Sequence, residues 1–83
     1  MTYDIVWDEP AINAAARFLK DDPVGLRHLF DAIDLLAHNP RPAGAAEYGS
    51  PNPRRVHVGR YRAMYEITEA TASIVVIHIG RTG

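Results

Sequence analysis

The sequence predicts a single α+β domain over residues 1–83, in which an N-terminal helical hairpin covers one face of an antiparallel sheet in the order β-α-α-β-β-β. Three patterns predict it: an alternating segment at residues 3–7, two amphipathic stretches between residues 8 and 38, and β patterns over residues 55–79. The length suits one domain. The chain has no cysteine and hence no disulfide bonds, but its 47% apolar residues are enough to form a core without them.

The first strand and helix follow from residues 3–21. Tyr3, Ile5 and Trp7 alternate with polar or smaller residues, which is typical of a half-buried strand. Asp8 is placed to cap a helix whose first turn contains Pro10, and we expect this helix to end near residues 20–21. Its predicted core-facing stripe consists of Ile12, Ala15, Ala16 and Leu19.

A second helix is predicted to begin at once, with Asp22 as its cap and Pro23 in its first helical position. Its apolar face comprises Leu26, Leu29, Phe30, Ile33, Leu36 and Ala37. It should stop before Pro40, and the short junction predicts an antiparallel pair of helices. Residues 39–53 contain four prolines and two glycines, so we expect a loop there with one short turn near residues 45–48.

The rest of the chain predicts three strands joined by short turns. Residues 55–58 alternate, Gly59 and Arg60 form a tight reversal, and residues 61–67 alternate again. After a turn at residues 68–71, the near-continuous apolar run at 73–79 predicts a strand covered on both faces, hence central in the sheet.

Charge is unevenly distributed, although the formal net charge is only -1. Residues 1–53 hold four basic and eight acidic side chains, whereas residues 54–83 hold five arginines and two glutamates. This favours a polyanion-binding C-terminal half, but an uneven distribution without functional meaning explains it equally well. The sequence shows neither a secretory signal pattern nor an apolar run of about 20 residues, so we expect a soluble cytoplasmic protein without a membrane partner.

The candidate site lies in residues 54–62. Strand alternation puts Arg55 and His57 on one face, and Arg62 can return to that face on the next strand. Such a group suits RNA cleavage by attack of a 2′-OH, with His57 transferring protons and the arginines stabilising charge on the phosphorane. The alternative is a solvent-exposed sheet face that is basic through alternation alone. His78, between two isoleucines, is interpreted as a structural histidine, and no motif indicates a metal or cofactor.

The same residues resemble a known family. The element order, the stop at residues 39–40, the run Arg55-Val56-His57-Val58-Gly59-Arg60-Tyr61-Arg62-Ala63-Met64-Tyr65 and the final Gly80-Arg81 are similar to the RelE/ParE superfamily of type II toxins. The resemblance implies an α+β toxin held inactive in a hetero-oligomer by a cognate antitoxin. RelE-like members cleave mRNA on the ribosome, whereas ParE-like members inhibit DNA gyrase.

For the site, the resemblance implies catalytic roles for His57, Arg62 and Arg81, with Arg81 one residue earlier than the family's arginine. It implies phosphate or RNA binding for Arg55, and we expect the basic neighbours Arg54 and Arg60 to share that role. RelE-like nucleases continue to a catalytic tyrosine or His-Tyr pair, whereas this sequence ends at Gly83 and has a pI near 6.4. We therefore expect an mRNA endoribonuclease of reduced activity; the alternatives are a gyrase inhibitor and a non-catalytic antitoxin-binding member.

Overall fold

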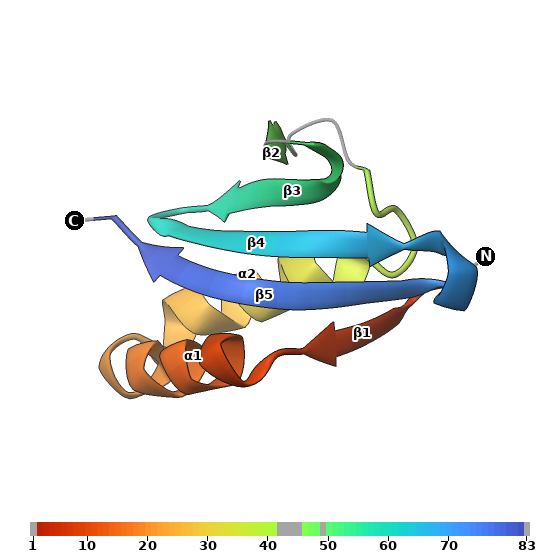
Figure 1. Ribbon diagram of the computed structural model, residues 1–83. Helices are drawn as coiled ribbons and strands as arrows, with labels where there is room; N and C mark the ends of the chain where they lie inside the picture. Colours follow the sequence, from red (N-terminus) through yellow and green to blue (C-terminus); the bar gives the residue numbers. More distant parts are fainter. Residues whose placement is uncertain (1, 42–45, 49, 83) are drawn as a thin grey trace.

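The computed structural model describes residues 2–41, 46–48 and 50–82. Its elements are β1 (Asp4–Trp7), α1 (Glu9–Asp21), α2 (Pro23–Leu35), β2 (Ala46–Tyr48), β3 (Ser50–Val58), β4 (Tyr61–Thr68), the 3-10 helix η1 (Glu69–Thr71) and β5 (Ser73–Arg81). The strands form one sheet in the order β1-β5-β4-β3-β2, and both helices lie on the same side of it (Figure 1). The α+β class and the helix-covered face are thus confirmed.

The sheet is mixed rather than wholly antiparallel. β2, β3, β4 and β5 pair antiparallel in turn, but β1 pairs parallel with β5, from Asp4 opposite Ser73 to Trp7 opposite Val76. The expectation of an antiparallel sheet is therefore wrong for this pair. Alternation along a strand shows which residues share a face, but it carries no information about strand direction. The central position predicted for the last strand is confirmed, because β5 lies between β1 and β4. The prediction that both of its faces are covered is wrong, because His78 is exposed on the face away from the helices.

The predicted loop at residues 39–53 contains two strand segments. β2 occupies residues 46–48, and β3 begins at Ser50, five residues before the predicted strand. The prolines at 51 and 53 hid this extension, because proline usually marks a break. Pro53 nevertheless lies in register opposite Glu66 of β4.

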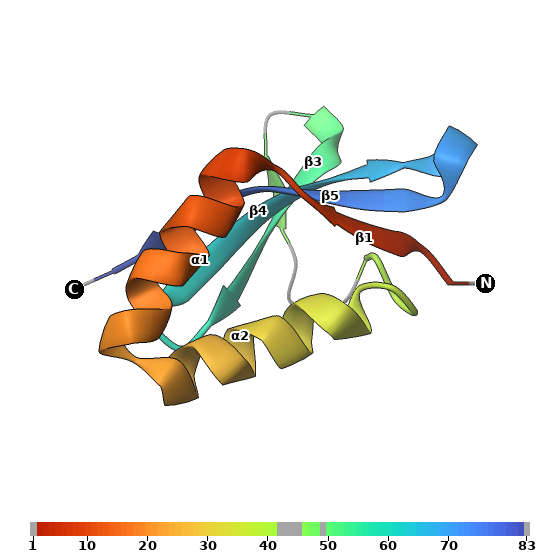
Figure 2. The same ribbon diagram turned by 90° about the horizontal axis from the view of Figure 1, so that it is seen from below.

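The helices begin at the predicted residues, but only one has a side-chain cap. The side chain of Asp22 accepts a hydrogen bond from the N–H of Gly25 at 3.0 Å at the start of α2. Asp8 precedes α1, and its backbone carbonyl accepts from Ile12 while its side chain makes no capping bond. From the junction at Asp22 the two helices diverge as a V across the sheet, rather than lying side by side as an antiparallel pair (Figure 2).

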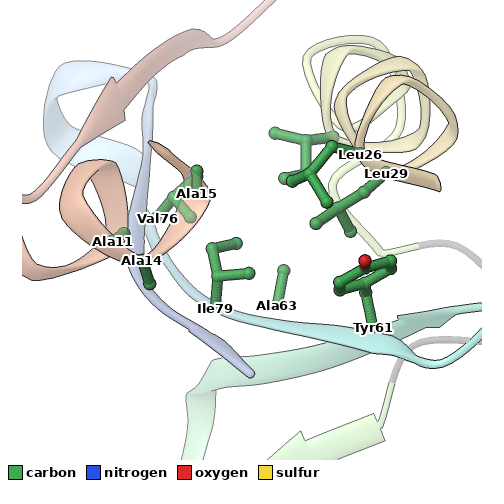
Figure 3. Close-up of a cluster of buried hydrophobic side chains, with 10 residues drawn as sticks. Ala11, Ala14, Ala15, Leu26, Leu29, Tyr61, Ala63, Val76 and Ile79 are labelled. Carbon is green, nitrogen blue, oxygen red and sulfur yellow. The ribbon is translucent and has the colours of Figure 1, made fainter. Parts of the chain in front are cut away.

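The buried face of α1 is one residue out of phase with the predicted stripe. Ala11, Ala14 and Ala15 are buried, whereas Ile12 and Leu19 are 50% and 43% exposed. Figure 3 shows the alanines facing Val76 and Ile79 of β5, with Tyr61 beneath Leu26 and Leu29 of α2. Two stripes on α1 have helical spacing, and the helix buries the one with small residues, which let its backbone lie close to the sheet. The prediction for Ile12, Ala16 and Leu19 is wrong.

The core lies between the helices and the sheet, and it leaves the other sheet face open. On β4, Tyr61, Ala63, Tyr65 and Ile67 are buried toward the helices, while Arg62 and Glu66 are exposed on the opposite side. We call that opposite side the open face. No helix in the described part of the chain is long and apolar enough to cross a membrane.

Candidate functional site: a basic pocket on the open face

Strand register places the central predicted residues on the open face. His57 of β3 lies opposite Arg62 of β4, and Arg62 lies opposite Gly80 of β5. In the next row, Arg55 lies opposite Met64. Directly opposite residues point to the same face of a sheet. The structure thus brings Arg55, His57 and Arg62 together on the surface that the helices leave uncovered, as alternation predicted.

His78 joins this group because β5 contains a bulge. Met64 pairs with His78 but its neighbour Tyr65 pairs with Val76, so Ile77 has no partner in the β4 register. The extra residue shifts the alternation, and consequently Val76 and Ile79 are both buried while His78 is exposed. The interpretation of His78 as a structural histidine on a buried strand is wrong. No sequence signal marks the bulge.

Among the residues that the structure describes, Arg55, Arg62, Met64 and His78 line a pocket of about 320 Å³ on this face. Two guanidinium groups and an imidazole thus border one hollow beside the Met64 thioether. Guanidinium binds phosphate oxygens in a planar, bidentate manner, and imidazole changes protonation between pH 5 and 8. The pocket combines anion binding with proton transfer. His57 shares the face but not the pocket lining.

Gly80 provides the room in this pocket. A Cβ atom at this position would lie 3.1 Å from Nε of Arg62 and 3.6 Å from Nε2 of His78. Both functional groups therefore converge on the space that a side chain at residue 80 would occupy. A glycine inside a strand often marks such a close approach, so Gly80 is the sequence feature that indicates this part of the site.

Arg81 lies on the helix side of the sheet, away from this group. It pairs with the buried Tyr61, its Cζ lies 4.7 Å from the centre of the Phe18 ring, and its Nη2 lies 3.6 Å from a carboxylate oxygen of Asp21. The resemblance implies catalytic roles for Arg62 and Arg81 together, but the two arginines lie on opposite faces of the sheet. Because side chains alternate, an arginine one residue early in the strand points to the opposite face.

Arg54 and Arg60 also lie apart from the open-face group. Arg54 pairs with Tyr65. Burial raises the pKa of Tyr65, and the positive charge of Arg54 partly offsets this rise. Arg60 lies in the turn between β3 and β4, and its Nη2 is 4.0 Å from Oδ2 of Asp22 at the α1–α2 junction. The pKa of Asp22 is lowered, chiefly by the Gly25 N–H and the Tyr61 hydroxyl. Phosphate binding by Arg54 or Arg60 would therefore occur elsewhere than in the pocket.

Within the described residues, no group of three histidine, aspartate or glutamate side chains is arranged to hold a metal ion. Glu66 is an acidic side chain on the open face, two residues after Met64 on β4, and it is not among the described residues that line the pocket.

Comparison with protein families decides the relationship. The model of the ParE toxin of type II toxin-antitoxin systems, parDE, matches residues 5–83. The chain belongs to this toxin family. It is therefore a type II toxin of the RelE/ParE superfamily, as the motif around Arg62 and the element order predicted. No curated protein matches the sequence.

Solved structures of RelE/ParE toxins share the fold at low sequence identity. A free mutant of the Escherichia coli toxin RelE superposes with a TM-score of 0.83 and 19% identity, covering 98% of this chain and 84% of that one. The toxin in the Pyrococcus horikoshii RelE–RelB complex gives 0.77 and 20%, covering 100% and 98%. A chain of the Pseudomonas aeruginosa ParDE system gives 0.78 and 11%, covering 99% and 98%. These likenesses extend to both branches of the superfamily.

Proposed function

We propose that this toxin is an endoribonuclease that cleaves mRNA on the ribosome. The observation that carries the proposal is the open-face pocket, which joins the guanidinium groups of Arg55 and Arg62 to an imidazole. RNA cleavage by attack of the 2′-OH needs cations that stabilise the charged phosphorane and groups that move two protons. The open face supplies both, with His57 opposite Arg62 as the proton-transfer residue that the sequence predicted.

Arg62 has the central position in this proposal. It lies on β4 between His57 of β3 and Gly80 of β5, so a phosphate on its guanidinium is accessible from both neighbouring strands. Arg55, one row away, provides a second cation in the same pocket. We assign to Arg62 the stabilisation of the transition state and to Arg55 the binding of an adjacent phosphate.

The test is cleavage of mRNA in a purified translation system. Arg62→Ala should lower the cleavage rate about 10²–10³-fold, the usual effect of removing one charge-stabilising donor. Arg62→Lys should retain a cleavage rate between those of Arg62→Ala and wild type, because lysine keeps the positive charge but lacks the bidentate guanidinium. Arg17→Ala is the matched control, since Arg17 is exposed on α1, far along the chain from this face. Intact mRNA at saturating wild-type toxin would refute the proposal.

Inhibition of DNA gyrase is the second candidate, and the match to the ParE family model favours it. A gyrase inhibitor would block supercoiling of plasmid DNA by purified gyrase and leave translation intact. The ribonuclease proposal predicts the reverse in both assays. The pair of assays on one toxin preparation therefore separates the two functions.

We further propose that a cognate antitoxin neutralises the chain in a hetero-oligomer. The RelE–RelB and ParDE structures that share its fold are toxin–antitoxin systems. Co-expression with the product of the adjacent reading frame should restore growth that the toxin alone arrests, and the two proteins should co-purify. Continued arrest on co-expression would exclude that product as the antitoxin.

A further inference from the structure

We propose that His78 is a second catalytic residue of the toxin, the base that accepts the 2′-OH proton, while His57 protonates the leaving oxygen. The inference rests on the proposed ribonuclease function and assigns the two proton transfers within its site. His78 lines the pocket together with Arg55 and Arg62, whereas His57 lies on the same face outside the pocket lining. The imidazole in direct contact with the pocket is thus that of His78.

The strand register gives the two histidines complementary positions. One row across the sheet contains His57, Arg62 and Gly80, and the next contains Arg55, Met64 and His78. His57 and His78 are therefore at opposite corners of a two-row patch, two strand spacings apart, or about 10 Å across the sheet. A phosphate held on Arg62 lies between them, so the imidazoles reach it from opposite sides, as attack and departure on one phosphorus require.

Gly80 leaves the path between His78 and Arg62 open. The point where a side chain at residue 80 would begin lies 3.6 Å from Nε2 of His78 and 3.1 Å from Nε of Arg62. The two nitrogens therefore border one small space, which a phosphate oxygen or a ribose hydroxyl could enter from the open face. The absence of a side chain at this position makes the imidazole nitrogen and the guanidinium accessible to the same small group.

The charged groups that face His78 come from the neighbouring strands. Arg62 and Glu66 lie on the same face of β4, and Arg55 lies beyond Met64 on β3. On the other side of β5, Asp8 follows β1, and its backbone N–H donates to the carbonyl of Val76. The two arginines border the pocket, so they are the charges that a bound phosphate would neutralise.

The step balances without any external reactant. Neutral His78 takes the proton of the 2′-OH as the bond from O2′ to phosphorus forms. The bond from phosphorus to O5′ breaks, and protonated His57 gives its proton to O5′. The products are a 2′,3′-cyclic phosphate and a 5′-hydroxyl end. Proton exchange with water returns both imidazoles to their starting states.

The decisive measurement is the dependence of mRNA cleavage on pH between 5.5 and 8.5 in single-turnover reactions with programmed ribosomes. Wild-type toxin should give a bell-shaped profile. His78→Gln should lower the rate about 10²–10⁴-fold and remove the acidic limb, and His57→Gln should remove the alkaline limb. His28→Gln is the matched control, because His28 is an exposed histidine on α2. All variants should bind a 2′-O-methyl RNA, which cannot react, with affinities close to wild type.

A second variant tests the space beside His78. Gly80→Ala places a methyl group against Arg62 and should reduce cleavage at least about tenfold, while the thermal midpoint stays at or above that of wild type, since glycine is unfavourable within a strand. If wild-type toxin cleaves mRNA and His78→Gln leaves the rate unchanged, or lowers it without altering the acidic limb, the assignment of His78 is overturned but the proposed function is not. Lack of cleavage by wild-type toxin would instead overturn the proposed function, and the assignment with it.

Discussion

Replacing Gly25 by alanine tests whether the contacts at the α1–α2 junction stabilise the fold. Gly25 lies within α2, where alanine is ordinarily favoured by about 1 kcal/mol. Here, however, the new Cβ would clash with Oδ2 of Asp22 and would lie 2.9 Å from Cε2 of Tyr61. The Asp22 side chain accepts from the Gly25 N–H and from the Tyr61 hydroxyl at 2.8 Å, so it cannot move away without breaking both bonds.

The expected magnitude follows from these contacts. Tyr61 is only 2% exposed, and overpacking a buried site typically costs about 1–3 kcal/mol. Loss of the Tyr61 hydroxyl bond adds about 1 kcal/mol, which offsets the gain in helix propensity. The net effect is a loss of about 1–3 kcal/mol, or a fall of roughly 5–15 °C in the thermal midpoint of so small a domain.

Urea unfolding followed by far-UV circular dichroism measures this loss. Val24→Ala is the matched control: Val24 is the preceding residue of α2, is 67% exposed, and should change stability by less than about 0.5 kcal/mol. In an Asp22→Ala background, Gly25→Ala should cost less, because the nearest clash is gone. A Gly25→Ala toxin as stable as wild type, or more stable, would refute the structural reasoning.

Three further outcomes follow from individual contacts. Tyr65→Phe should lower the unfolding free energy by about 1 kcal/mol in the same urea assay, because the buried Tyr65 hydroxyl donates to the Pro40 carbonyl at 2.7 Å. Asp22→Asn should be less stable than wild type at pH 7, and the difference in unfolding free energy should shrink below about pH 4. Because the pKa of Asp22 is lower in the folded than in the unfolded state, its carboxylate stabilises the fold above the unfolded-state pKa, and this contribution is lost as the pH falls through the folded-state pKa. Arg81→Ala should leave mRNA cleavage close to wild type, because its guanidinium lies over Phe18 on the helix side; a loss as large as that of Arg62→Ala would contradict this placement.

Much of the fold was predictable because local patterns determine it. Alternation on β4 correctly separated the buried Tyr61 and Tyr65 from Arg62, and the Asp22-Pro23 pair correctly marked the start of α2. The buried stripe of α1 was not predictable in the same way. Its two candidate stripes differ by one residue, and the choice depends on how closely the helix approaches β5, which is a tertiary property.

The candidate site was predictable only where strands are regular. Arg55, His57 and Arg62 were placed on one face from the spacing of β3 and β4, and their register confirms that arrangement. Their roles in RNA cleavage remain predictions. Arg81 was misplaced because a position taken from a family resemblance carries an uncertainty of about one residue, and in a strand one residue decides the face.

The bulge at Ile77 explains why alternation does not place the residues of β5 correctly, and it links the core to the candidate site. In a regular strand, Val76 and His78 would share the helix face, and Ile79 would point to the open face. With one residue unpaired, Val76 and Ile79 are both buried, so His78 and Gly80 both face the open side, at Met64 and Arg62. The same irregularity therefore completes the apolar core and supplies the pocket with its imidazole. Deleting Ile77 would keep both faces as they are, because Val76, His78 and Ile79 would then alternate as in a regular strand.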